Sequence, residues 1–250
     1  MSRIAIISAL HEELAEVLAL MPDEHKTEIA GRAFWQGHLQ GHEVVAVLSG
    51  IGKVAAATTA TVLLERFAPQ HVIFTGVAGG LALGVEVGDI VVGSAFVQHD
   101  MNAAPLFPRW EMPGYGRSRF QADLALVQVL HESAKEAVTW LPKLLDEATL
   151  RTFGLHSPSV HQGEIVTGDR FVSTAAESDA LRADLPQALA VDMESAAVAQ
   201  VCHDYGVPFG AVRTVSDRAD DDAHVDFQHF LQQVARHYSA RVVRKALNLL

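Results

Sequence analysis

Residues 188–217 read ALAVDMESAAVAQVCHDYGVPFGAVRTVSD, in which two short apolar runs flank a segment with helical spacing. The runs Ala188–Val191 and Phe209–Val215 have the length of buried strands. Between them, SAAVAQVCHDY repeats small and apolar residues at helical spacing, and Gly206 and Pro208 end that pattern. The pattern predicts a strand–helix–strand unit, which is typical of the α/β class.

Charged residues stand at the ends of both predicted strands. Asp192, Met193 and Glu194 follow the first strand, while Asp217 closes the second and Arg213 interrupts it. A helical crossover joins parallel strands, so we expect both carboxyl ends at one edge of the sheet, where α/β proteins bind ligands. Two carboxylates and an arginine there are suited to acid–base chemistry. The alternative is an ordinary strand–helix–strand unit whose charges are solvated.

The composition indicates a compact enzyme rather than a nucleic-acid-binding or membrane protein. The chain has 250 residues, of which 49% are hydrophobic and 20% charged, and its formal net charge is −11. That charge argues against a nucleic-acid partner, and no run of about 18 apolar residues is present to span a membrane. The chain begins with a strand pattern instead of a signal peptide, and Cys202 is its single cysteine. We therefore expect a cytoplasmic protein.

The remaining chain alternates strand and helix patterns. Apolar runs predict further strands at Arg3–Ala9, Phe34–Leu39, Glu43–Leu48, His71–Thr75, Ile90–Val97 and Ser159–Thr167. Apolar residues at helical spacing predict helices at Leu10–Leu20 and His224–Leu250. Further helices are predicted at the Ala- and Thr-rich residues 54–66, at Gln121–Val138, and at the polar segment Ser173–Ala183, with Ser173 or Thr174 as N-cap. The glycines of residues 76–80 are interpreted as a turn, and Asp220–Asp222 as a solvated loop. Neither a repeat nor a linker is evident, so of one large domain or two small ones we predict a single domain over residues 1–250.

The predicted helix Leu10–Leu20 has an acidic first turn that contains Glu12 and Glu13. Negative charge is favourable beside a helix N-terminus, so the simplest interpretation is that both glutamates serve only the helix dipole. Because a buried strand directly precedes this helix, its first turn also lies at the ligand-binding edge of the sheet.

Two patterns typical of other kinds of site are incomplete. Residues 49–53, SGIGK, do not fit a phosphate loop, because Val54 follows Lys53 where a serine or threonine is required. His99–Asp100 resembles a metal-binding pair, but no second cluster stands at ligand spacing. We expect neither a metal nor a cofactor.

The segment Ala103–Arg119 has neither a helix nor a strand pattern. It contains three prolines and the aromatic side chains of Phe107, Trp110 and Tyr115. Long loops in compact domains are usually lids or interfaces. We expect this loop to cover a substrate or a neighbouring subunit.

Seven motifs occur along the chain in the order IAIISALHEEL, SGIGKVAAA, TGVAGGL with VGDIVV, HD, TGDRFV, AVDMESAAVAQVC and VPFGAVRTVSD. In these motifs the chain resembles the 5′-methylthioadenosine/S-adenosylhomocysteine nucleosidases of the nucleoside phosphorylase superfamily, over nearly its whole length. The resemblance implies a three-layer α/β/α sandwich on a mixed, mostly buried central sheet. It also implies a small-molecule nucleoside substrate and a homodimer.

The resemblance implies roles for individual residues. Asp217 matches the acid that protonates the purine at N7, Glu13 the residue that polarises the attacking water, and Glu194 the carboxylate that holds the ribose hydroxyls. Phe171 would stack on adenine, and the backbone of Val172 would bind its edge. Further substrate contacts and walls are implied for Met193, Arg213, Ser216, Gly79, Ala78, Leu10, Ile51, Phe107 and Phe227.

Three features depart from the family pattern. Asp192 replaces the first glutamate of a Glu-Met-Glu motif, and Val77 stands where a serine often lies beside the water. The loop QHDMNAAPLFPRWEMPG also differs, and selectivity for the 5′ group is expected to be set there. These departures affect the preferred substrate more than catalysis.

Alternative functions remain within and outside this family. Phosphorolysis, as in the purine nucleoside phosphorylases, needs arginines for phosphate, whereas Glu12 and Glu13 would repel it. Hydrolysis of aminodeoxyfutalosine is compatible with the same residues. A non-catalytic nucleoside-binding protein is disfavoured, because all three expected catalytic carboxylates are present.

Overall fold

The strands of this computed structural model form one mixed sheet. The structure describes residues 2–155, 157–220 and 223–250, with the side chains of residues 142 and 223–226 left out. Within these residues the sheet has ten strands. They are β1 (Arg3–Ser8), β2 (His25–Ile29), β3 (Arg32–Leu39), β4 (His42–Leu48), β5 (His71–Gly80), β6 (Ile90–Gln98), β7 (Phe120–Gln121), β8 (Val160–Thr167), β9 (Ala188–Asp192) and β10 (Phe209–Asp217).

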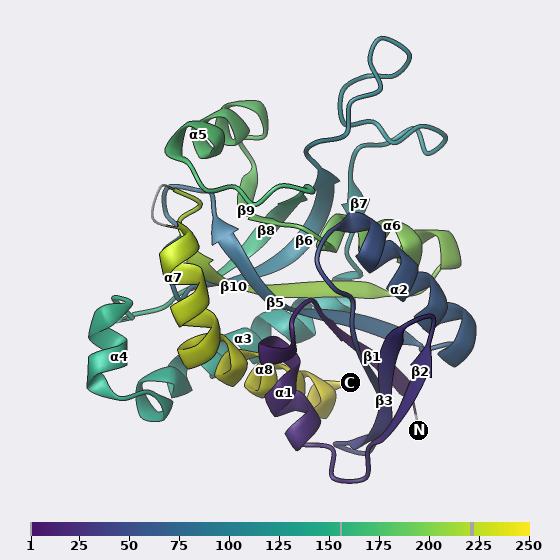
Figure 1. Ribbon diagram of the computed structural model, residues 1–250, viewed down its shortest axis with the longest axis vertical. Helices are drawn as coiled ribbons and strands as arrows, with labels where there is room; N and C mark the ends of the chain where they lie inside the picture. The colour runs from purple at the N-terminus through teal and green to yellow at the C-terminus, as the bar shows by residue number, and fades with distance from the viewer. Residues whose placement is uncertain (1, 156, 221–222) are drawn as a thin grey trace.

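The sheet combines a closed ring of strands with an open arm. Strand β10 pairs with both β5 and β6, and the ring closes through β8 and β9, which returns to β5. Strands β1, β4, β3 and β2 extend outward from β5 as the arm (Figure 1). Closure leaves the five ring strands without a free edge, so their backbone groups are paired away from water.

Helices cover both faces of the sheet, which confirms the predicted three-layer α/β/α sandwich. They are α1 (His11–Ala19), α2 (Lys53–Phe67), α3 (Leu124–Leu144), α4 (Glu147–Thr152), α5 (Ala175–Asp184), α6 (Ser195–Tyr205), α7 (Ala223–Phe230), the π-helical turn η1 (Leu231–Ala235) and α8 (Arg236–Leu249). Helices α1 and α3 pack on α8 in one layer, and α2 packs on α6 in the other (Figure 1). No helix in the described part of the chain is both long and apolar enough to cross a membrane.

Most predicted elements are confirmed, because their signals are local. Helix α6 spans the predicted SAAVAQVCHDY and ends at Gly206, whose φ of 64° is the left-handed conformation that glycine adopts without strain. Strand β1 is buried on both faces, with Ile4–Ile7 excluded from solvent, as its continuous apolar run predicts.

One local interpretation is wrong, and some elements were not predicted. Residues 76–80 continue strand β5 instead of turning, because Gly79 and Gly80 pair with β9. Strand β2 and helix α4 were not predicted, since β2 is polar and exposed and α4 is short and has no buried face. The interpretation of Asp220–Asp222 as a loop includes residues 221 and 222, which lie outside the described residues.

The predicted parallel crossover from β9 to β10 is also wrong. Strand β10 runs parallel to β5, whereas β9 runs antiparallel to it, and the two are not neighbours. Their carboxyl ends nevertheless meet, because β9 crosses β5 only at Gly79 and Gly80, and Asp217 of β10 also pairs with Gly79. This convergence of three strand ends positions the site.

Candidate active site

A cavity of about 320 Å³ opens where β5, β9 and β10 end. Its wall is mainly apolar and includes four buried carboxyl groups, those of Glu13, Asp192, Glu194 and Asp217. The other lining residues are Ala9, Leu10, Ile51, Val77, Ala78, Gly79, Arg170, Phe171, Val172, Val191, Met193, Ser216 and Phe227. The structure therefore brings together all the predicted site residues except Arg213 and Phe107.

Glu13 lies in the first turn of α1 and is held by backbone donors from two segments. Its Oε2 accepts hydrogen bonds from the amides of Ala9 at 2.9 Å and Leu10 at 2.8 Å, and Oε1 accepts one from Val77 at 3.0 Å. Burial raises the pKa of Glu13, and the Arg213 guanidinium and these amides oppose that shift only in part. The fixed carboxylate is placed to act as a base on a water molecule.

Glu194 immediately precedes helix α6 and faces the same cavity. Its Oε1 accepts a hydrogen bond from the amide of Gly52 at 3.1 Å, and its Oε2 lies 3.5 Å from Nη2 of Arg213. Burial raises the pKa of Glu194 most, Arg213 lowers it, and the negative charge of Asp192 raises it again. A carboxylate so placed can accept hydrogen bonds from hydroxyl groups in the cavity.

Arg213 lies directly behind Glu194 in the middle of β10 and is fully buried. Its Nε donates to Asp192 at 2.9 Å and its Nη2 to Ser195 at 3.0 Å, while its guanidinium carbon lies 4.0 Å from the centre of the Phe74 ring. Its Nη1 finds no hydrogen-bond partner among the residues that the structure describes. Arg213 therefore acts from behind the cavity wall rather than as part of it.

The shorter side chain of Asp192 still completes this network. Its Oδ1 accepts a hydrogen bond from Thr167 Oγ1 at 2.5 Å, and its Oδ2 accepts from Ser195 as well as from Arg213. The replacement of glutamate by aspartate therefore leaves the arginine paired.

Asp217 stands at the end of β10, and 2% of its surface is exposed. Its Oδ1 accepts a hydrogen bond from the Ala219 amide at 2.9 Å, and its Oδ2 lies 2.7 Å from the Ser216 hydroxyl. A serine hydroxyl can donate or accept, so this second contact suits an ionised or a protonated carboxyl group.

Aromatic and aliphatic side chains form the mouth of the cavity. Phe171 is 41% exposed and meets Phe227 edge to face, with 5.6 Å between the ring centres. Ile51 is also exposed. Apolar surface left open beside buried polar groups is typical of a small-molecule site.

Phe107 is not among the residues that line the cavity of its own chain. It belongs to the segment 103–119, which projects at the top of the molecule as drawn in Figure 1. Five lining residues were not among the predicted site residues, namely Ala9, Val77, Arg170, Val191 and Asp192. Each lies within two positions of a predicted site residue, and that proximity was the available signal.

The described residues contain no group of three or more histidine, cysteine, aspartate or glutamate side chains that could hold a metal ion. The carboxylate of Asp100, half of the His99–Asp100 pair, lies 2.6 Å from the Lys53 ammonium.

Comparison with known proteins relates the whole chain to one family. The family described as "Phosphorylase superfamily" matches residues 3–248. A 5′-methylthioadenosine/S-adenosylhomocysteine nucleosidase of Anoxybacillus flavithermus is 40% identical over 240 residues, which cover 96% of this chain and 95% of the relative.

Solved structures share the fold over the same length. The 5′-methylthioadenosine/S-adenosylhomocysteine nucleosidase of Neisseria meningitidis, in complex with methylthio-immucillin-A, has a TM-score of 0.87 and 33% identity, covering 100% of both chains. A futalosine hydrolase of Helicobacter pylori has a TM-score of 0.86 and 29% identity, covering 100% of this chain and 98% of that one.

Proposed function

The chain belongs to the phosphorylase superfamily and, within it, to the 5′-methylthioadenosine/S-adenosylhomocysteine nucleosidases, which are N-glycosyl hydrolases. On that premise we propose that it hydrolyses the N-glycosidic bonds of 5′-methylthioadenosine and S-adenosylhomocysteine, and that of 5′-deoxyadenosine, to release adenine. The observation that carries this proposal is the convergence of Glu13, Glu194 and Asp217 on one cavity with an apolar mouth.

Breaking the bond to adenine places positive charge on the ribose and negative charge on the departing base. Asp217 is the acid that protonates the purine at N7 and so stabilises the leaving group. The burial of Asp217 and its contact with the Ser216 hydroxyl support this role, because both are compatible with a protonated carboxyl group.

Glu13 is the base that directs water to C1′ of the ribose. Its three backbone hydrogen bonds fix the carboxylate and favour its ionised form. The Val77 amide supplies one of them, so the loss of a serine hydroxyl at this position leaves the base anchored. The buried guanidinium of Arg213 helps to orient the water and Glu194.

Glu194 binds the ribose hydroxyls, and its charge stabilises the cationic sugar in the transition state. Met193 packs under the ribose, Phe171 stacks on adenine, and the backbone of Val172 binds the edge of the base. Ala78, Gly79 and Ser216 complete the purine side, while Leu10, Ile51 and Phe227 enclose the 5′ substituent.

The proposal is tested with a substrate panel in phosphate-free buffer. Methylthioadenosine, adenosylhomocysteine and 5′-deoxyadenosine should each yield free adenine and a free sugar, at the same rate as in the presence of phosphate. A strict phosphate requirement, with a sugar 1-phosphate as product, would instead establish a phosphorylase. The buried Glu13 carboxylate argues against that outcome, because it would repel phosphate.

Hydrolysis of aminodeoxyfutalosine is the second candidate. It is favoured by the similarity to the futalosine hydrolase of Helicobacter pylori, which has a TM-score of 0.86 and covers the full length of this chain, although its identity of 29% is below the 33% and 40% of the two nucleosidases. Including aminodeoxyfutalosine in the same panel separates the two, since the preferred substrate is the one with the higher kcat/KM.

A further inference from the structure

Lys53, Asp100 and Asp169 form a closed ring of polar contacts outside the cavity. The Lys53 ammonium lies 2.6 Å from Asp100 Oδ1, the Asp169 amide donates to Asp100 Oδ2 at 2.9 Å, and the Lys53 amide donates to Asp169 Oδ1 at 2.7 Å. The three residues come from the start of α2, the turn after β6 and the loop after β8. None of them lines the cavity.

Two members of this ring, Lys53 and Asp169, lie close in sequence to two different walls of the cavity. Lys53 follows Gly52, whose amide donates to Glu194. Asp169 is two residues before Phe171, which lines the mouth. The ring therefore joins the wall that holds Glu194 to the wall formed by the 170–172 segment.

The ring also extends to the helix that follows Glu194. The Lys53 ammonium donates to Gln98 Oε1 at 3.1 Å, and Gln98 Nε2 donates to Gln200 of α6 at 2.8 Å. Helix α6 and the start of α2 thus share one set of contacts, although they are far apart in sequence.

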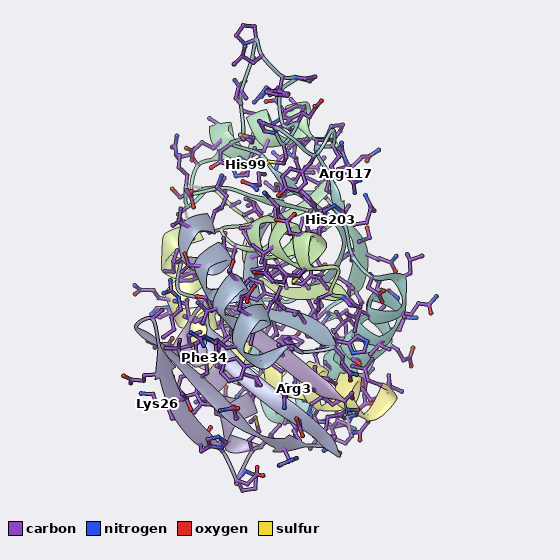
Figure 2. The ribbon with its side chains drawn as sticks, turned by 90° about the vertical axis from the view of Figure 1, so that its right-hand side faces the viewer. Arg3, Lys26, Phe34, His99, Arg117 and His203 are labelled. Atoms are coloured by element: carbon purple, nitrogen blue, oxygen red, sulfur yellow. The ribbon has the colours of Figure 1, made fainter. Side chains whose placement is uncertain are left out.

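The segments that carry Asp100 and Asp169 also pack closely against each other. A Cβ atom on Gly168 would lie 2.3 Å from Nε2 of His99, so a larger residue there would require the His99 ring or the loop to shift. The His99 amide donates to Thr167 at 2.9 Å. Figure 2 shows His99 at the base of the projecting segment that carries Arg117, at the end of the molecule opposite Arg3 and Lys26.

The charges of the ring are partly shielded from water. The Lys53 side chain is 18% exposed and that of Asp100 is 33% exposed. Partial burial acts to raise the pKa of Asp100, but the hydrogen bonds from Lys53 and the Asp169 amide together hold that pKa below its ordinary value. The Asp100 carboxyl group is therefore ionised at neutral pH, and water screens its attraction to Lys53 less than it screens a surface ion pair.

We propose that Lys53, Asp100 and Asp169 are positioning residues that fix the distance between the ribose wall at Glu194 and the purine wall at Phe171. This role rests on the proposed function. A nucleoside touches both walls at once, whereas free adenine touches the purine wall alone. Breaking the ring therefore weakens nucleoside binding more than adenine binding.

The experiment compares wild type with Lys53→Met, which removes the ammonium but keeps the aliphatic stem, and with Asp100→Asn. KM for methylthioadenosine should rise about tenfold, and the inhibition constant of adenine should change less than about threefold. Lys53→Arg, which keeps the charge, should have a KM within about threefold of that of wild type. The variant that combines Lys53→Met and Asp100→Asn should have a KM for methylthioadenosine no higher than that of either single variant, because both substitutions break the same ring.

Lys245→Met is the matched control. Lys245 pairs with Glu136 at 2.9 Å, and the two side chains are 32% and 38% exposed, but the pair joins α8 to α3 away from the cavity. The Lys245→Met variant should have the same KM for methylthioadenosine as wild type. Thermal unfolding identifies any variant that does not fold, in which case the other ring variant carries the test.

Two outcomes would overturn the positioning role. One is an equal loss of affinity for methylthioadenosine and for adenine, and the other is an unchanged KM in both folded ring variants. Failure of the proposed function is seen separately, because wild type itself would then not cleave methylthioadenosine.

Discussion

Nη2 of Arg213 lies 2.9 Å from Oδ2 of Asp192, and the two side chains are 0% and 1% exposed. Removing one partner of such a buried ion pair is strongly destabilising, because the remaining charge has lost its hydration and no longer has its partner. The pair also fixes Glu194, whose Oε2 lies 3.5 Å from the same nitrogen of Arg213. The network thus links the stability of the fold to the geometry of the site.

Asp192→Asn should reduce the free energy of unfolding by about 3–5 kcal/mol, since it removes the nearer counter-charge of the buried Arg213 and leaves the longer 3.5 Å contact with Glu194. Urea denaturation followed by circular dichroism measures the change. Glu147→Gln is the control, because its partner Arg151 is 64% exposed and the loss there should stay below about 1 kcal/mol. Equal effects of the two substitutions would contradict this account of Asp192.

Gly76→Ala should reduce kcat by roughly 100-fold. A Cβ atom on Gly76 would lie 2.5 Å from Nη1 of Arg213 and 2.6 Å from Oε1 of Glu13, so one or both groups must move. Gly84→Ala is the control, because its Cβ would meet no atom within 4 Å. Steady-state kinetics on methylthioadenosine gives both values, and a fully active Gly76→Ala enzyme would show that the position of Glu13 is not critical.

The pH dependence should report the buried carboxyl groups. Burial raises the pKa of Glu13 and of Glu194 above the ordinary value of 4.5. Because both groups must be ionised in the proposed mechanism, the acidic limb of the kcat/KM profile should lie above pH 4.5. A limb centred at or below that pH would contradict the assignment.

The same shifts predict how stability changes with pH. Between pH 4.5 and the raised pKa values, the native state holds protons that the unfolded state has lost. These two groups therefore make the protein less stable as the pH rises through that interval. Urea denaturation at several pH values, compared with the Glu13→Gln variant, isolates the contribution of Glu13.

Asp217→Asn should lower kcat by about 10²–10⁴-fold with little change in KM, because it removes the proton donor but keeps the size. Its Oδ1 can still accept the hydrogen bond from the Ala219 amide. Asp23→Asn, at a half-exposed aspartate that pairs with His38, is the control and should be as active as wild type. A variant that keeps more than about a tenth of wild-type kcat would exclude Asp217 as the acid.

The wild-type enzyme should also prefer adenine nucleosides to inosine. A protonated carboxyl group can give a hydrogen bond to N7 and accept one from a 6-amino group, whereas a 6-oxo group offers only an acceptor. The mismatch should reduce kcat/KM for inosine by about ten- to a hundred-fold. Equal rates on methylthioadenosine and inosine would defeat this explanation of base selection.

We also expect a homodimer in which segment 103–119 is shared across the interface. This segment projects from the molecule (Figures 1 and 2), and its Leu106 is 83% exposed. Analytical ultracentrifugation should show a dimer at micromolar concentration, and Leu106→Asp should weaken it. A wild-type protein that sediments only as a monomer would rule this out.

Much of the fold follows from local sequence signals. The apolar run of β1, the helix from Ser195 to Tyr205 and its end at Gly206 depend on residues that are close in sequence. The hairpin between β3 and β4 is also local, since Gln40 and Gly41 adopt the positive φ values of its turn. The lining residues Glu13, Glu194 and Asp217 were predicted because each belongs to a motif at a strand or helix end.

What the sequence by itself determined is therefore the type of most elements and most of the residues that line the cavity. Only the tertiary structure decided how the elements pair. It extends β5 through Gly80 and orients β9 against β5. It also places the Arg213 guanidinium behind the cavity wall, with Asp192 as its partner. The physical reason is that helix and strand periodicity depends on near neighbours, whereas strand pairing and buried ion pairs depend on contacts between residues far apart in the chain.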